Sequence, residues 1–169
     1  MITVRAETAE DISAVRRVNE LAFERAEEAA LVDALRVAAD PQISLVAVAQ
    51  DEVVGHIFFS PVQLESEDSD FKALGLAPMA VLPAYQNQGI GSRLIREGLK
   101  ECLRLGCRVV FVLGHPEYYT RFGFIPASRK GLRSVYAVPD EVFMVAELET
   151  GALGGRRGLV KYRPEFDAV

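Results

Sequence analysis

The sequence has little of what would direct a chain to a membrane or to nucleic acid. It contains no run of about 18 apolar residues, the length that a membrane-spanning helix needs. Its first residues, 1–7, lack the basic and then apolar pattern of a signal peptide. The 24 acidic residues outnumber the 19 basic ones, and the basic residues are dispersed along the chain. We therefore expect a soluble, cytoplasmic protein with neither a membrane nor a nucleic acid as its partner.

Cysteine is also scarce. Cys102 and Cys107 are the only two, and their spacing matches neither a zinc site nor a disulfide framework. We expect two reduced thiols in or near the core, and no metal site. Half of the 169 residues are apolar, which is enough to build a sizeable core. The sequence therefore predicts a single domain that spans residues 1–169.

Hydrophobic periodicity predicts a strand, two helices and then mainly strands. The first helix opens at Thr8 and Asp11, which are spaced as a capping box. Strands are expected at residues 2–6, 43–49, 53–64, 71–82, 109–113, 142–148 and 159–162, and further helices at residues 27–39, 92–105 and 116–121. The strand, helix, strand order from residue 71 to residue 113 implies a parallel pair with a right-handed connection. The fold class is α/β or α+β, with a mostly antiparallel sheet and one parallel pair near its centre.

A glycine-bearing loop joins the strand at residues 71–82 to the helix at residues 92–105. Its sequence, Gln-Asn-Gln-Gly-Ile-Gly at 86–91, leaves unpaired N–H groups at the positive end of a helix, where a phosphate or pyrophosphate binds. Ser92 stands where a P-loop requires lysine, which argues against nucleotide hydrolysis. Leu94 replaces the third glycine of a dinucleotide fingerprint, which argues against that site. The structural alternative is that the glycines only allow a tight turn and close helix packing.

Two motifs in this order resemble those of the GNAT N-acetyltransferase superfamily. The first, Gln86-x-x-Gly89-x-Gly91, resembles the superfamily's pyrophosphate loop, and the second, Tyr-Thr-Arg-Phe-Gly-Phe at 119–124, resembles its tyrosine-bearing segment. Three further segments, at 54–61, 75–81 and 113–119, are similar to a bacterial branch of uncharacterised predicted acetyltransferases. The resemblance spans nearly the whole chain. It implies a mixed sheet of six to seven strands, about four flanking helices, and a central parallel pair that splays apart.

The resemblance also implies acetyl-CoA as the cofactor. Backbone N–H groups of the loop would bind its pyrophosphate, with Arg93 adding positive charge. In this family the strand before the loop bulges, and its backbone groups pair with the pantetheine arm; Pro78, which has no N–H, is consistent with such a break. The residues that the resemblance assigns to the cofactor are Met79, Ala80, Val81, Gln86, Asn87, Gln88, Gly89, Ile90, Gly91, Ser92, Arg93, Tyr119 and Phe122.

Three residues are candidates for the chemistry of acetyl transfer. In this resemblance the N–H of Val81 polarises the thioester carbonyl, and the phenol of Tyr119 protonates the departing thiolate. His115 is the candidate base, since histidine titrates in a useful range. The alternative for Tyr119 is that its ring packs and only hydrogen-bonds the cofactor. The alternatives for the base are His56, Glu117, Glu24, Glu28 and a chain of water molecules.

The predicted function is direct transfer of an acetyl group from acetyl-CoA to a primary amine. The alternative is a module that binds an acyl-CoA as a sensor without catalysing transfer. The acceptor stays open between a small molecule and a peptide or protein, because its contacts would come from the early helices and residues 128–139. A homodimer is compatible with the resemblance, and the sequence does not decide the oligomeric state.

Overall fold

The computed structural model describes residues 1–65 and 71–169, which form two compact units. Unit 1 consists of Met1–Ser60, Ala77–Gly98 and Pro164–Val169, and unit 2 consists of Pro61–Leu76 and Leu99–Arg163. Residues 65–70 are polar and acidic, which predicts a connection between two strands, and beyond residue 65 this segment lies outside the described residues. No helix in the described ranges is both long enough and apolar enough to cross a membrane. That the whole chain forms a single domain stays a prediction.

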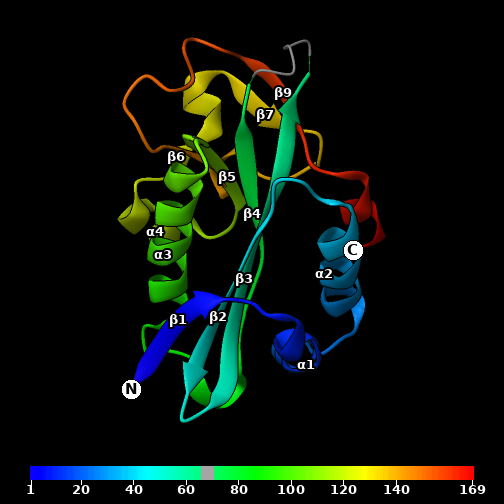
Figure 1. The fold of residues 1–169 in the computed structure, drawn as a ribbon. Helices are drawn as coiled ribbons and strands as arrows, with labels where there is room; N and C mark the ends of the chain where they lie inside the picture. Colours follow the sequence, from blue (N-terminus) through cyan, green and yellow to red (C-terminus); the bar gives the residue numbers. More distant parts are fainter. Residues whose placement is uncertain (66–70) are drawn as a thin grey trace. The chain divides into compact units, whose positions relative to one another are not determined.

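The main helices and strands lie close to the residues that the sequence predicts (Figure 1). The helices are α1 (Ile12–Phe23), α2 (Glu27–Ala38), α3 (Ile90–Arg104) and α4 (Pro116–Tyr119). The strands are β1 (Ile2–Ala6), β2 (Ile43–Ala49), β3 (Glu52–Leu64), β4 (Ala73–Val81), β5 (Val109–Leu113), β6 (Ile125–Pro126), β7 (Leu132–Ser134), β8 (Phe143–Glu147) and β9 (Gly158–Lys161). Hydrogen-bonded neighbours follow the order β1-β2-β3-β4-β5-β8-β6, and β9 pairs with β3 and β7. The predicted mixed α/β fold class is confirmed.

Unit 1 contains an antiparallel sheet of β1, β2 and the first part of β3. Ile2 pairs with Ala49 at one end of the β1–β2 ladder, and Ala49 pairs with Glu52 across the turn to β3. Gln50 and Asp51 form that turn with φ angles of 50° and 66°. Two consecutive left-handed residues are typical of a two-residue hairpin, because their backbone matches the twist of the strands. The predicted antiparallel hairpin is confirmed.

The predicted capping box is present before α1. One carboxylate oxygen of Asp11 accepts a hydrogen bond from the Thr8 backbone N–H at 2.7 Å. The same oxygen lies 2.7 Å from Nη1 of Arg5, which ties β1 to the start of the helix. The hydrogen bond from Arg5 is the main reason that the pKa of Asp11 is lowered to about 2. Val15 and Val18 then carry the buried face of α1.

Helices cover both faces of the sheet in unit 1. Neighbouring residues of a strand point to opposite faces, and in β3 Gly55 faces α3 while His56 faces α1. A Cβ atom built on Gly55 would lie 3.1 Å from Leu94 and 3.2 Å from Ile90, so the absent side chain lets α3 pack closely. On the other face, Nδ1 of His56 lies 3.3 Å from the side-chain amide of Asn19 in α1. β3 therefore packs against α3 on the face of Gly55 and against α1 on the face of His56.

Unit 2 contains the predicted parallel pair. β4 and β5 pair over Ala73–Leu76 and Val109–Val112, and β8 pairs antiparallel with β5. The described sheet has nine strands, more than the expected six or seven. The additional strands, β6 and β7, have two and three residues, which is too short to produce an alternating pattern. β7 also pairs in parallel with β9, so the sheet has a second parallel pair that the sequence did not predict.

Aromatic rings fill the core of unit 2. Phe111 of β5 stacks on Phe143 of β8, with ring centroids 5.5 Å apart. Gly75 of β4 leaves space for Tyr162, because a Cβ atom built on this glycine would lie 2.6 Å from the tyrosine ring. Leu132 of β7 and Val160 of β9 belong to the same buried cluster. The short strand β7 therefore contributes to the core although its sequence pattern is weak.

The two cysteines lie at the C-terminal end of α3. Both are free thiols and both are buried, as the sequence predicts. Gly106 ends the helix with a φ of 82°, and the Cys107 N–H then donates to the Cys102 carbonyl at 2.9 Å. Burial raises the pKa of both thiols. They are therefore protonated at neutral pH and poor nucleophiles.

Candidate active site

The predicted pyrophosphate loop lies in unit 1, between β4 and α3. Leu82 ends the strand by donating its N–H to the Val54 carbonyl at 2.8 Å, and a single 3₁₀ turn, Pro83–Tyr85, follows. Asn87 and Gly89 then take left-handed conformations, with φ angles of 64° and 83°. These two residues turn the chain so that α3 begins directly afterwards.

The N-terminal end of α3 has the features of an anion site. The helix begins at Ile90, and its first internal hydrogen bond runs from the Arg93 N–H to the Gly89 carbonyl at 3.1 Å. The first N–H groups of a helix have no acceptor one turn earlier within it, which here concerns those of Ile90 and Gly91, and the helix dipole places positive charge there. Apart from Gly89 itself and its two chain neighbours, no described residue has an atom within 4 Å of a Cβ atom built on Gly89. An anion can therefore approach the backbone at this glycine.

Side chains of the loop make contacts that the sequence did not reveal. The Gln86 side chain donates from Nε2 to the Val81 carbonyl at 2.9 Å, and the Gln88 side chain donates to the Ala84 carbonyl at 3.3 Å. Nη1 of Arg93 donates to the carbonyl of Ile2 in β1. The Arg93 guanidinium is thus already bonded to the sheet, and its predicted addition of charge to the loop stays a prediction.

The end of β4 would supply the contacts to the pantetheine arm. Ala80 is buried, whereas Met79 and Val81 are half-buried. Among the described residues, the pairing of β4 with β5 covers Ala73–Leu76 and stops before these three residues. Their backbone groups thus lie outside that ladder, as the proposed role requires.

Tyr119 lies in unit 2, on the short helix α4. Its side chain is buried, and its ring packs edge-on against Phe124 and Tyr118, with centroids 5.6 Å and 5.1 Å apart. A Cβ atom built on Gly114 would lie 2.2 Å from the Tyr119 ring, so this glycine makes room for it. Burial raises the pKa of the Tyr119 phenol above its ordinary value. The phenol is therefore protonated at neutral pH and can donate a proton.

Phe122 and His115 flank Tyr119 in the sequence. Phe122 is half-buried, and its ring centroid lies 6.5 Å from that of Tyr119. His115 is exposed at the start of α4, where its carbonyl accepts the N–H groups of Tyr118 and Tyr119 at 3.1 Å each. Its backbone therefore has a structural role in starting the helix, and its role as the base stays a prediction.

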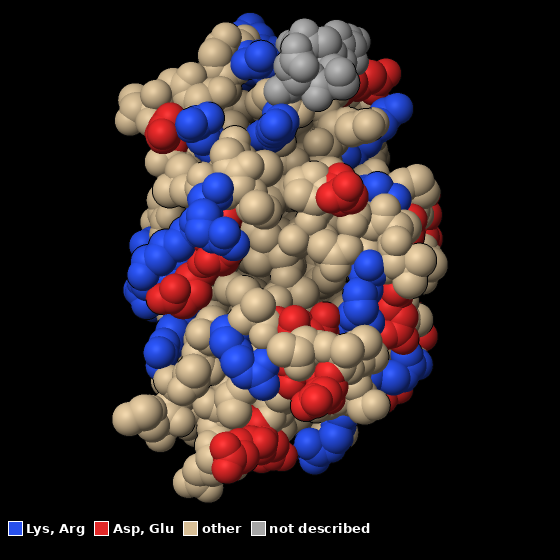
Figure 2. Space-filling view, viewed as in Figure 1, with Lys and Arg blue, Asp and Glu red and all other residues tan. Residues whose placement is uncertain are grey.

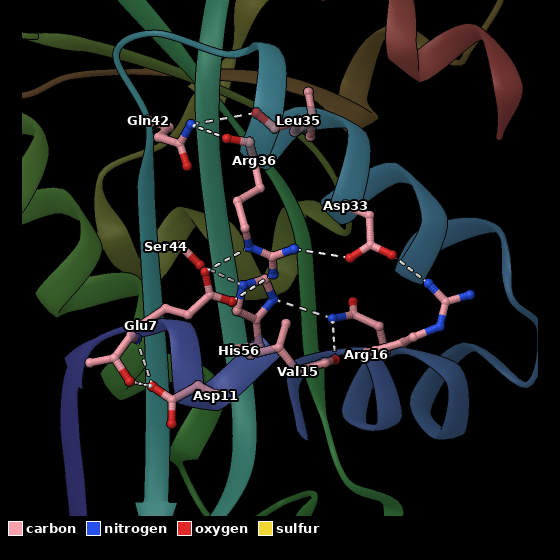
Figure 3. Close-up of polar contacts among 12 residues, drawn as sticks. Glu7, Asp11, Val15, Arg16, Asp33, Leu35, Arg36, Gln42, Ser44 and His56 are labelled. Atoms are coloured by element: carbon pink, nitrogen blue, oxygen red, sulfur yellow. Dashed lines mark hydrogen bonds and ion pairs between the residues drawn. The ribbon is translucent and has the colours of Figure 1, made fainter. Parts of the chain in front are cut away.

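His56 is not placed to act as a base. It is completely buried in unit 1, where Nδ1 lies 3.3 Å from Asn19 and Nε2 lies 2.8 Å from the Ser44 hydroxyl (Figure 3). Because the Asn19 amide donates to Nδ1, the neutral ring carries its proton on Nε2 and donates to Ser44. Burial, with a contribution from the nearby charge of Arg36, lowers the pKa of His56 to about 3. His56 therefore serves as a neutral structural residue.

Ion pairs join the elements around His56 (Figure 3). Arg36 of α2 lies 2.7 Å from the Glu7 carboxylate and 2.9 Å from the Asp33 carboxylate. Arg16 of α1 binds the same Asp33 at 2.5 Å. The network thus links α1, α2 and the residue after β1. Its function is to hold these elements together.

The glutamates considered as bases differ in their surroundings. Glu28 is buried, and its carboxylate accepts hydrogen bonds from two nitrogens of Arg25, Nε at 2.9 Å from Oε1 and Nη2 at Oε2, so it forms a structural ion pair. Glu24 and Glu117 are exposed.

On the face shown in Figure 2, basic side chains lie close to acidic ones. Among the described residues on that face, acidic side chains lie beside the basic groups.

The glycine loop, the start of α3 directly after it and the buried tyrosine are the features that the two motifs predict. A family model described as an acetyltransferase (GNAT) domain matches residues 3–127. The chain belongs to the GNAT acetyltransferase family. The resemblance of the two sequence motifs to this family is confirmed.

The relatives of the chain are named as uncharacterised N-acetyltransferases. YjhQ of Escherichia coli K12 is 44% identical over 135 residues, which are 78% of this chain and 74% of YjhQ. YhbS of the same strain is 35% identical over 165 residues, which are 97% of this chain and 98% of YhbS. The predicted similarity to a branch of uncharacterised acetyltransferases is therefore confirmed.

Two solved GNAT structures are similar to nearly the whole chain. The YhbS protein of E. coli, crystallised with CoA, is 34% identical with a TM-score of 0.91, over 98% of this chain and 92% of that one. A GNAT acetyltransferase of Brucella melitensis, crystallised with acetyl-CoA, is 36% identical with a TM-score of 0.80, over 99% of each chain. The fold of this chain is therefore the GNAT fold.

The predicted site residues are divided between the two units. The end of β4 and the pyrophosphate loop belong to unit 1, and the Gln86–Val81 hydrogen bond joins them. Tyr119, Phe122 and His115 belong to unit 2, around the turn from β5 to α4.

Proposed function

We propose that this protein is an acetyl-CoA-dependent N-acetyltransferase that acts by direct transfer to a primary amine. The observation that carries the proposal is the start of α3, where Gly89 is left-handed and open beside the N–H groups of the first turn. Such a turn binds a pyrophosphate through its backbone. Two similar proteins crystallised with CoA or acetyl-CoA support the same cofactor.

Binding of the cofactor uses two adjoining segments of unit 1. The N–H groups from Gln88 to Ser92 hold the pyrophosphate, and the backbone of Met79, Ala80 and Val81 pairs with the pantetheine arm as another strand would. The pairing of β4 with β5 ends at Leu76, which supports this role for the residues that follow. The pantetheine arm then brings the thioester carbonyl to the Val81 N–H.

Transfer proceeds without a covalent enzyme intermediate. The neutral amine attacks the thioester carbonyl, and the Val81 N–H stabilises the oxyanion as the new C–N bond forms. When the C–S bond breaks, the CoA thiolate takes the phenolic proton of Tyr119. The attacking nitrogen loses its proton to His115 or to water. Burial raises the pKa of Tyr119, so the phenol is protonated at neutral pH and its proton is present when the C–S bond breaks.

The acceptor is a small-molecule or peptide amine. A cavity in unit 2 supports acceptor contacts from the segment after residue 127. Its walls are formed by Ser128, Leu132, Arg133, Ser134, Tyr136, Ala137, Val138, Pro139, Asp140 and Phe143.

We place the enzyme in the cytoplasm as one domain over residues 1–169. Sedimentation would establish whether it is a homodimer.

Incubation of the protein with acetyl-CoA and a library of amines tests the proposal. Release of CoA, read with a thiol reagent, is expected to depend on both the protein and one class of amine. Mass spectrometry of the product should show an added acetyl group. Saturable acetyl-CoA binding with no release across amines and peptides would favour the sensor function instead.

A further inference from the structure

Two hydrogen bonds hold the peptide group between Val81 and Leu82. Its carbonyl oxygen, on Val81, accepts from Nε2 of Gln86 at 2.9 Å. Its N–H, on Leu82, donates to the carbonyl of Val54 at 2.8 Å. A peptide group is planar, so contacts at both of its ends fix the orientation of the whole plane.

The turn after β4 brings Gln86 back to this peptide. The Tyr85 N–H donates to the Leu82 carbonyl at 2.8 Å, which closes the single 3₁₀ turn Pro83–Tyr85. Pro83 starts this turn with its φ restricted by the ring. Gln86 follows in an extended conformation, with φ −70° and ψ 157°. From this position its side chain reaches the end of β4, where its amide N–H donates to the Val81 carbonyl.

The orientation of this peptide affects the neighbouring N–H of Val81. With the plane after Val81 fixed, rotation about the Val81 Cα–C bond is restricted, and the strand end is less able to twist. An oxyanion is stabilised only by a donor that already points to where the charge develops. If the Val81 N–H tilts away from this position, the transition state is less stabilised, although every group of the site is still present.

We propose that Gln86 is a positioning residue for acetyl transfer, which orients the Val81 N–H by holding the carbonyl of the same residue. This inference rests on the proposed function of Val81 as the oxyanion donor. It assigns the Gln86 side chain to the end of β4, whereas the phosphates are bound by the backbone of the residues that follow. Gln86 thereby couples the pyrophosphate loop to the thioester end of the cofactor.

Infrared spectroscopy of acetyl-CoA labelled with ¹³C at the thioester carbonyl tests this role without an acceptor. Hydrogen bonding to the carbonyl lowers its stretching frequency, so the bound cofactor reports on the Val81 N–H. The comparison uses the unsubstituted protein with Gln86→Ala, Gln86→Glu and Gln86→Arg. Alanine and glutamate remove the N–H donor, while arginine keeps one.

Gln42→Ala is the matched control. Gln42 also donates from Nε2 to backbone carbonyls, those of Ala39 at 2.7 Å and Arg36 at 3.0 Å, but it caps the end of α2 (Figure 3). This substitution removes a bond of the same kind from the same unit. It is expected to leave the carbonyl band of bound acetyl-CoA unchanged.

The expected result is a carbonyl band that shifts to lower frequency on binding to the unsubstituted protein, Gln86→Arg and Gln42→Ala. Gln86→Ala and Gln86→Glu should bind the cofactor with similar Kd and lose most of this shift. Identical bands in all bound proteins would overturn the role of Gln86, as would a loss of affinity with an unchanged band. Failure of the unsubstituted protein to bind acetyl-CoA would refute the proposed function itself, and this inference with it.

Discussion

The ring of Tyr119 occupies the space that a side chain at Gly114 would fill. The nearest ring atom, Cε2, lies only 2.2 Å from a Cβ atom built on this glycine. Real Cβ atoms do not approach other atoms so closely, so any side chain at residue 114 must displace the ring. Gly114 follows the last residue of β5 and precedes α4, and its lack of a side chain leaves room for the tyrosine ring.

Replacing Gly114 with alanine should therefore impair transfer through Tyr119. We expect a loss of stability of about 1–3 kcal/mol from overpacking, measured by urea unfolding. Release of CoA should fall while the Kd for acetyl-CoA stays the same. In a Tyr119→Phe background the ring is still present, so the stability loss should persist but activity should fall little further. Additive losses of activity would contradict the role of Gly114 in placing the phenol.

Tyr119→Phe removes the acid and keeps the ring. Its contacts with Phe124 and Tyr118 should persist, so the thermal midpoint and the Kd for acetyl-CoA should change little. A general acid contributes about 10²–10⁴-fold to a rate, and kcat for CoA release should fall within that range. Normal turnover by the phenylalanine variant would show that Tyr119 only packs.

Two substitutions at Gly89 separate backbone strain from cofactor binding. Alanine at a φ of 83° should cost roughly 1–2 kcal/mol of stability, whereas asparagine tolerates this conformation better. Both side chains extend into the open space before α3 and should weaken acetyl-CoA binding in calorimetry. An unchanged Kd in both variants would mean that the pyrophosphate does not bind at this turn.

The buried histidine predicts a dependence of stability on pH. The pKa of His56 is about 3 in the folded protein, below its ordinary value of 6.5, so the unfolded chain binds the proton first. Stability should therefore fall as pH decreases from 6.5 toward about 3, by at most about 1.4 kcal/mol per pH unit from this group. Asp11 affects stability only at lower pH. The stability that its carboxylate provides is lost as pH falls from its ordinary pKa of 3.8 toward about 2.

Urea unfolding at pH values from about 7.5 to 4 measures this effect, and it should be compared with that of His56→Gln. The glutamine variant should lose less stability than the unsubstituted protein over the same interval, because it takes up no proton there. Equal slopes for both proteins would contradict the assignment of a neutral histidine in the folded state.

Local chemistry made much of the loop predictable from the sequence. Gly89 has a positive φ, which fits the tight turn that the glycines of the loop allow, and Gly106 ends α3 as a helix-capping glycine does. The capping box of Thr8 and Asp11 is likewise a short-range signal. In each case the residues that determine the conformation are neighbours in the sequence.

Contacts between distant residues were not predictable in this way. The sequence alone leaves His56 as a possible base. Its structural role depends on Asn19 and Ser44, which come from other elements and cannot be inferred from a strand pattern. The clearance between Gly114 and Tyr119 also depends on the turn between them. The sequence signal for this clearance was Gly114 itself, a glycine just before the helix that carries Tyr119. The tyrosine motif at 119–124 does not include this glycine and so does not explain it.

Isothermal titration of the protein with acetyl-CoA tests the central claim most directly. We expect saturable binding of one cofactor per chain, and weaker binding to Gly89→Asn. The thermal midpoint should rise at saturating cofactor, since a ligand that binds only the folded state stabilises it. No saturable heat at millimolar acetyl-CoA, with no shift of the thermal midpoint, would contradict the account.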